Sequence, residues 1–294
     1  MRSVCAPGVY ATLTTTAQRT MLHKLSARCT KLAHAHELLI ARDQPSSEAT
    51  AAFGQTLAAS LRVALQNDSS VRFLPGEELH ITLQVSPETE TLQVYIQPSP
   101  PAPSNLDAAL SRPMERAAAN VREDVLRGAS GSWATPLVHP SLEPVRGLSV
   151  EETLLHEAGT DRVLEGLNSN LFVVFSDGSL RTAATSEGAY PGSMREAVLG
   201  LARQPSNAAL FPGGIEERAP TVAELTAGQW QEAWLTCSSR KVTPLARVWQ
   251  PGAVGRGASA GEGSWTELQG RERGSQMRGL LEEHVRRESE PIAL

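Results

Sequence analysis

The sequence contains very little lysine: of its 27 basic residues among 294, only Lys24, Lys31 and Lys241 are lysines. It also lacks any uncharged apolar run near the roughly 18 residues that a membrane helix needs, which excludes a spanning helix. The formal net charge of −5 argues against a dedicated binder of nucleic acid or of an anionic membrane, since such proteins carry a basic excess. A small ligand, including an anionic one, is compatible with this charge.

Cysteine is equally scarce, and Cys5, Cys29 and Cys237 are far apart in the chain. An odd number of separated cysteines fits a reducing compartment, and the first residues show no targeting peptide, so we expect a cytoplasmic protein. There is no C-x-x-C pair, and His156-Glu157 is not followed by a second histidine one helical turn on. We therefore expect no metal site.

The composition changes in the middle of the chain, which indicates two domains. From Pro98 the sequence reads PSPPAPSN, which is typical of a stiff extended spacer, and an Ala/Arg-rich stretch follows it. We expect a small α+β domain over residues 1–125, whose connector covers about residues 98–130, and a larger domain over residues 126–294.

Apolar spacing and turn residues place the expected elements. In the first half they are helices over residues 17–41 and 56–66 and strands over residues 8–16, 79–85 and 92–97. In the second half they are strands over residues 152–155, 171–175, 180–182, 234–236 and 242–248 and helices over residues 194–203 and 275–287. Asp177-Gly178 is typical of a type I′ hairpin turn between two of these strands.

Three features carry positive charge or polar groups suited to an anion. Lys24, Arg28 and Lys31 are four and three residues apart, which puts them on one side of a helix, although a solvated face explains the same spacing. Pro191-Gly192 opens a second helix, whose first N–H groups attract a phosphate. With the hydroxyls of residues 236–239, these features would form a phosphate pocket.

Several segments together resemble the class IV aminotransferases, the fold-type IV pyridoxal-phosphate enzymes. They are, in order, GVYAT from Gly8, EGLNSNLFVV from Glu165, DGSLRT from Asp177, YPGSMR from Tyr190 and TCSSRKVTP from Thr236. The resemblance implies a two-domain D-amino acid aminotransferase-like fold, with a small α+β N-terminal domain and a larger C-terminal β-barrel-like domain with flanking helices. It also implies pyridoxal 5'-phosphate as cofactor, a small amino acid as substrate and a homodimer.

Carried over by position, the resemblance implies that Glu165 faces the pyridine nitrogen of the cofactor. Ser193, Met194 and Ser238 would then hold the phosphate. Lys31 stands where the family has a phosphate-binding arginine, and the backbone of Ser239 would lie near the substrate carboxylate. A carboxylate at the ring nitrogen keeps it protonated, and the protonated ring is the electron sink of the family's chemistry.

The chain departs from the family at the lysine that anchors the cofactor as a Schiff base. No lysine lies between Lys31 and Lys241, and Ser132, beside Trp133, stands near the expected position. Arginine cannot substitute because it stays protonated. Lys241 is the sole candidate for a replacement amine.

Two interpretations follow from this absence. The chain is either an aminotransferase or lyase with impaired chemistry, or a non-catalytic protein of the same fold. The second would hold pyridoxal phosphate or a similar anion without a covalent link, or would act as a partner subunit.

Overall fold

A computed structural model describes the chain in several segments, and the account below is confined to them. They are residues 9–14, 21–23, 29, 47–67, 79–85, 92–98, 103–111, 150–157, 159–167, 169–238, 240–252 and 263–291. None of the helices in these segments is both long and apolar enough to cross a membrane.

The chain divides into two compact units, which we describe separately. The larger is made of residues 1–4 and 102–282, and the smaller of residues 5–101 and 283–294. The structure places this division earlier than the boundary expected at residue 125. The reason is β5 (Leu106–Leu110), which pairs in parallel with two strands from the second half of the chain, a contact that no local pattern shows.

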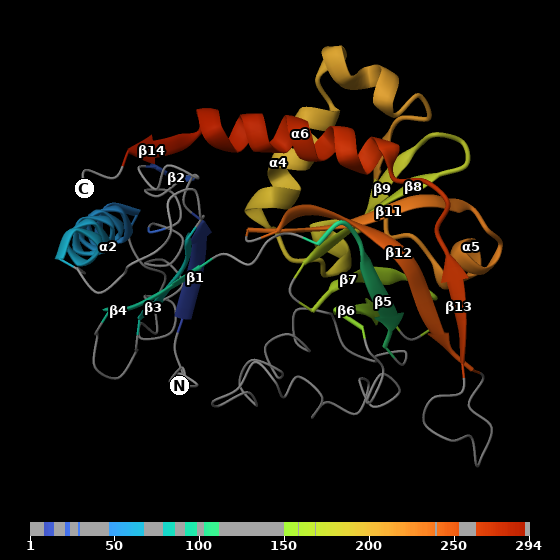
Figure 1. Ribbon diagram of the computed structural model, residues 1–294, viewed down its shortest axis with the longest axis horizontal. Coiled ribbons are helices and arrows are strands. Elements are labelled where there is room, and N and C mark those ends of the chain that lie inside the picture. The colour runs from blue at the N-terminus through green and yellow to red at the C-terminus, as the bar shows by residue number, and fades with distance from the viewer. Residues whose placement is uncertain are drawn as a thin grey trace. The chain divides into compact units, whose positions relative to one another are not determined.

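The larger unit is built on one sheet that closes into a barrel (Figure 1). Its remaining strands are β6 (Glu152–His156), β7 (Val163–Gly166), β8 (Asn170–Phe175), β9 (Leu180–Thr182), β10 (Ile215–Glu217), β11 (Trp230–Cys237), β12 (Lys241–Pro251) and β13 (Gly263–Glu267). The order is β10-β9-β8-β11-β12-β5-β6-β7, and β7 also pairs with β8. That pairing closes six strands, so the expected barrel-like domain is confirmed.

All six barrel strands contribute one face to a single apolar core. Leu106, Val163, Val173, Leu235 and Val248 belong to this core, and each is fully buried or nearly so. Because side chains alternate along a strand, the neighbouring residues lie on the outer face of the barrel.

The outer face of β8 and β11 is covered by helical segments. They are α4 (Ser193–Ala202), which contacts β11, and the short helix η4 (Pro205–Leu210) beside it. Beneath them the rings of Phe172 and Trp234 are stacked with centroids 6.1 Å apart, and Phe211 lies against the same tryptophan. The contact between Phe211, the C-cap of η4, and Trp234 of β11 helps to hold this short helix against the barrel.

The β8–β9 hairpin is present, but its turn differs from the type I′ prediction. Phe175 N–H bonds Ser179 O, which leaves a three-residue loop, and only Gly178 has a positive φ, of 81°. A three-residue loop with a left-handed glycine is the next common hairpin connection. Pro212 presses on Gly178 here, since a Cβ at residue 178 would lie 2.8 Å from its ring.

The smaller unit has a three-stranded antiparallel sheet and a helix. The sheet order is β1-β3-β4, from β1 (Val9–Thr14), β3 (Leu79–Val85) and β4 (Leu92–Pro98), and the helix is α2 (Ser47–Asn67). The helix expected over residues 17–41 is wrong at β2 (Met21–His23), a strand paired with β14 (Ser289–Pro291). That partner comes from the other end of the chain, so local apolar spacing could not reveal it.

Three further helical segments complete the described chain. They are the short helix η3 (Thr185–Glu187), α5 (Val222–Thr226) and the C-terminal α6 (Glu272–Arg287). The α5 helix begins with a capping box between Thr221 and Glu224, in which each side chain bonds the other's backbone N–H. The α6 helix confirms the expected C-terminal helix and starts three residues earlier than predicted.

Candidate functional site

Four residues from four adjacent strands form a row at one end of the barrel. Glu165 pairs with Asn170, Asn170 with Thr236, and Thr236 with Val242. Paired residues of neighbouring strands lie on the same face about 5 Å apart, so these side chains share one side of the sheet. Because Leu171 and Leu235 belong to the barrel core, the row lies on the outer face.

Glu165 is fully buried within this row and is hydrogen-bonded to the segment before α4. Its Oε2 accepts from Asn170 Nδ2 at 2.9 Å and from Tyr190 N–H at 3.0 Å. Asn170 Nδ2 also donates to Tyr190 O at 2.9 Å. A buried carboxylate requires such donors, and here they fix the backbone at residue 190 against the row.

The N-terminus of α4 adjoins the same row. Gly192 is its N-cap, so no side chain caps the first turn. A Cβ at residue 192 would lie 2.2 Å from Asn170 Oδ1, which explains why glycine stands there. The first turn, with Ser193 and Met194, therefore begins beside Asn170 and adds the positive end of a helix dipole to this place.

A buried arginine anchors the start of α4. Arg195 Nη2 donates to Ala183 O at 2.7 Å and to Glu217 Oε2 at 2.8 Å. The guanidinium groups of Arg203 and Arg195 lower the pKa of Glu217 below its ordinary value of 4.5. Near neutral pH this carboxylate is therefore charged and ties α4 to β10.

Thr236 brings a buried hydroxyl into the row. The residue is 1% exposed, and its Oγ1 has no hydrogen-bond partner among the residues that the structure describes. An unpaired buried hydroxyl costs free energy, so a group that it can bond to would be stabilised beside it. Ser238 lies two residues later, in the turn after β11 ends.

The structure brings some of the predicted site residues together and leaves others undescribed. Glu165 is hydrogen-bonded to Asn170, and Ser193 and Met194 begin α4 directly after Gly192, which lies beside Asn170. Ser238 follows β11, the strand that carries Thr236. Predicted residues that fall outside the described segments are Lys31, Ser132 and Ser239.

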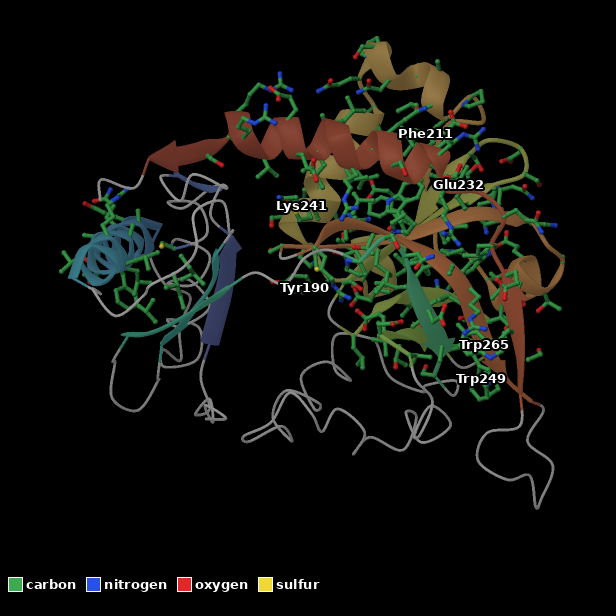
Figure 2. The ribbon with its side chains drawn as sticks, in the orientation of Figure 1. Tyr190, Phe211, Glu232, Lys241, Trp249 and Trp265 are labelled. Carbon is green, nitrogen blue, oxygen red and sulfur yellow. The ribbon has the colours of Figure 1, made fainter. Side chains whose placement is uncertain are left out.

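Lys241 is the first residue of β12 and is paired with Cys237, one position from the row. Its φ is +56°, a left-handed conformation that is uncommon for a residue with a side chain. Figure 2 shows Lys241 and Tyr190 on the same side of the larger unit in that view, whereas Trp249 and Trp265 lie at the opposite end of β12. No described group of three His, Cys, Asp or Glu residues is arranged to hold a metal ion.

Sequence reasoning missed the parts of the site that depend on close contact. In the sequence, Asn170, Tyr190 and Arg195 stand out only as members of the matched segments, and no role is predicted for any of them. The alternation along residues 170–175 could have shown that Asn170 faces away from the core.

Comparison with known proteins identifies the family and the fold of this chain. The profile of the family Amino-transferase class IV matches residues 58–248, well over half of the chain. The chain belongs to the class IV aminotransferases. A search of the curated proteins finds no match.

Solved structures share the fold of this class IV chain. A branched-chain amino acid aminotransferase of Thermobaculum terrenum in its PLP form is 18% identical, with a TM-score of 0.60 over 98% of this chain and 90% of that one. The branched-chain enzyme of Escherichia coli is 15% identical, with the same TM-score and coverage. An aminotransferase of Brucella abortus bound to PLP is 13% identical, with a TM-score of 0.60 over 97% of this chain and 94% of that one.

Proposed function

We propose that this class IV protein holds pyridoxal phosphate without a covalent link, and that its transamination or lyase chemistry on a small amino acid is impaired. The observation that carries the proposal is a polar row on one face of the sheet, in a chain that has no lysine over the stretch where the family has its anchoring amine. Glu165, Asn170 and Thr236 lie in one row across paired strands, and no lysine lies between Lys31 and Lys241.

The described residues fit the cofactor in their chemistry. Glu165 is a buried carboxylate of the kind that keeps a pyridine nitrogen protonated. Thr236 supplies a buried hydroxyl without a partner among the described residues, which suits a phosphate oxygen. The first turn of α4, at Ser193 and Met194, supplies helix N–H groups, and Ser238 a further hydroxyl.

When bound, the cofactor supplies an electron sink that stabilises a carbanion at the substrate. The chain's own contribution is to hold and orient. Glu165, fixed by Asn170 and by the backbone of Tyr190, would keep a proton on the ring nitrogen. The dipole of α4 and the Thr236 hydroxyl would hold the anionic end.

The missing lysine removes the group that moves a proton between substrate carbons. Loss of a positioned general base costs about 10²- to 10⁴-fold in rate. Lys241 could restore an amine only if its side chain reaches the row, from a position on β12 next to Val242. Without it, the protein binds the cofactor as a non-catalytic member or partner subunit of this fold, which is the second candidate function.

Absorption spectroscopy with borohydride trapping tests the proposal. We expect wild-type protein to change the spectrum of added pyridoxal phosphate saturably. After borohydride reduction and peptide mass mapping, no peptide should carry a pyridoxyl adduct. Inorganic phosphate should compete for binding, because the helix N-terminus and hydroxyls recognise the anionic end.

Each other outcome has a definite meaning. A pyridoxyl adduct on Lys241 would contradict non-covalent binding. If Lys241→Ala then lost both the adduct and the turnover of amino acids, Lys241 would be established as a relocated amine. Absence of any spectral change or thermal stabilisation by the cofactor would overturn the proposal altogether. Turnover that survives Lys241→Ala would contradict the claim that the missing lysine impairs catalysis.

Two further expectations are part of this proposal. The protein should form a homodimer and should occur in the cytoplasm. Light scattering of the purified protein tests the first, and cell fractionation tests the second.

A further inference from the structure

The larger unit contains a second buried carboxylate, Glu152, that the proposed function does not use. It opens β6, and its side chain is 3% exposed. Its Oε2 accepts from Ser169 Oγ at 2.8 Å and lies 3.5 Å from Arg240 Nη2. A charge this deeply buried is retained only with hydrogen-bond and ionic partners, and these two come from different turns.

The first of these turns precedes Asn170. It is closed by Gly166 N–H, which donates to Ser169 O at 2.8 Å, and by Leu167 N–H, which donates to Thr153 O at 3.0 Å. The carboxylate presses closely on it, since a Cβ at residue 166 would lie 2.4 Å from Ser169 Oγ and 2.9 Å from Glu152 Cδ. Position 166 therefore needs glycine because the side chains of Ser169 and Glu152 together occupy the space beside it.

The second turn joins β11 to β12 and carries Ser238 before Arg240. Arg240 is largely covered, with a side chain 22% exposed, and directly precedes β12. Its ion pair with Glu152 links residues 88 positions apart in the chain. One carboxylate thus contacts both turns that border the polar row.

We infer that Glu152 is a positioning residue, which through Ser169 and Arg240 sets the spacing of two turns, the one that follows Glu165 and the one that carries Ser238. It would thereby set the distance between the carboxylate at the ring nitrogen of the cofactor and a hydroxyl at its anionic end. The inference rests on the proposed function for its ligand. The link between the turns stands on its own contacts. Because both turns are held by the buried Glu152 carboxylate before the cofactor binds, less conformational entropy is lost on binding.

Titration with pyridoxal phosphate measures the effect on binding. We expect Glu152→Gln and Arg240→Ala each to raise its Kd about tenfold, and the double variant to raise it little further, because both break one link. Arg240→Lys should restore the Kd to within about threefold of wild type, since it keeps the charge. A merely structural role would give no such rescue.

Arg247→Ala is the matched control. Arg247 also lies on the larger unit, and its Nη2 and Nε donate to Asp107 Oδ2 at 2.7 and 3.0 Å, away from the two turns. Its loss removes an ion pair at least as short as that of Arg240. The Kd for pyridoxal phosphate should stay within about twofold of wild type.

Hydrogen exchange without ligand gives a second readout. The backbone amides of Ser238 and Arg240 should exchange faster in Arg240→Ala than in wild type or Arg247→Ala. If Glu152→Gln does not fold, the Arg240 variants still decide the matter, because this side chain is partly solvent-exposed.

The outcomes separate the two proposals. Wild-type protein that fails to bind pyridoxal phosphate overturns the proposed function, while faster exchange in Arg240→Ala would still support the link between the turns. Unchanged exchange together with unchanged Kd in Arg240→Ala overturns the positioning role alone. Effects of Glu152→Gln and Arg240→Ala that multiply in the double variant would also overturn it.

Discussion

Asn170 Nδ2 donates to both Glu165 Oε2 and Tyr190 O, each at 2.9 Å. One amide therefore joins the end of β7 to the segment that leads into α4. The Glu165 carboxylate completes the link by accepting from Tyr190 N–H. The three residues hold the carboxylate, the strand and the helix start in one arrangement.

Removal of this amide should destabilise the larger unit. Asn170→Ala leaves a buried carboxylate with one donor fewer, and we expect the free energy of unfolding to fall by about 2 kcal/mol. Urea denaturation measures the change. The control is Asn207→Ala, which removes a single amide bond to Leu201 O from a less buried site and should cost at most about 1 kcal/mol.

The close approach at Gly192 predicts a position-specific cost for alanine. Gly192→Ala places a Cβ against Asn170 Oδ1 and should lower the free energy of unfolding by about 1–3 kcal/mol. Gly200→Ala is the matched change within α4, where no atom of the described residues lies within 4 Å of the added Cβ. It should raise stability by about 0.5–1 kcal/mol, and equal effects of the two changes would contradict the packing argument.

The Thr236 hydroxyl, which has no partner within the described segments, predicts opposite effects on stability and on binding. Thr236→Val should raise the free energy of unfolding by about 1 kcal/mol and weaken pyridoxal phosphate binding about tenfold. Urea denaturation and spectroscopic titration measure the two effects.

Thr243→Val is the control for Thr236→Val. Thr243 is equally buried, its Oγ1 also has no partner within the described segments, and it pairs with Leu235 of the barrel core. It should stabilise the fold similarly and leave cofactor binding unchanged. Loss of binding in this variant as well would show that Thr236 has no special role.

The Glu217 carboxylate predicts an acid-dependent contribution to stability. Hydrogen bonds from Arg203 and Arg195 lower its pKa below the ordinary 4.5, so the folded state favours the charged form. The stabilisation is complete above pH 4.5 and is lost as the pH falls through the lowered pKa.

Urea denaturation of wild type and Glu217→Gln over an acid pH series tests this dependence. The difference in unfolding free energy should be constant near neutral pH and shrink below pH 4.5. A difference that stays constant through the acid range would exclude this linkage.

Local patterns in the sequence were sufficient for much of the larger unit. Alternation and turn residues predicted β8, β9 and α4 to within a few residues, because these elements are consecutive and each bears its own periodicity. Local patterns did not predict β2, and they put residues 106–110 of β5 in the first domain. Both strands pair with partners that are distant in the chain. The turn type at Gly178 was also predicted wrongly, because Asp-Gly occurs in more than one kind of hairpin loop.

The residues of the candidate site also divide into those that local motifs predict and those that depend on contacts between distant segments. Glu165, the α4 start and the residues after Thr236 could be found from ordered motifs, and the scarcity of lysine needs only counting. Three features could not be found from the sequence. They are the two hydrogen bonds that Asn170 Nδ2 donates, the contact that requires glycine at position 192 and the Glu152–Arg240 ion pair. They depend on atoms brought together by strand register.

The sequence by itself determined which chemical groups are available. They are the Glu165 carboxylate within a matched motif and the hydroxyls of Ser193 and Ser238, and no lysine lies between Lys31 and Lys241. Only the tertiary structure decided which of these groups meet. Closure of the six-stranded barrel sets β7, β8 and β11 side by side, and the fixed spacing of paired strands then aligns Glu165, Asn170 and Thr236 on one face.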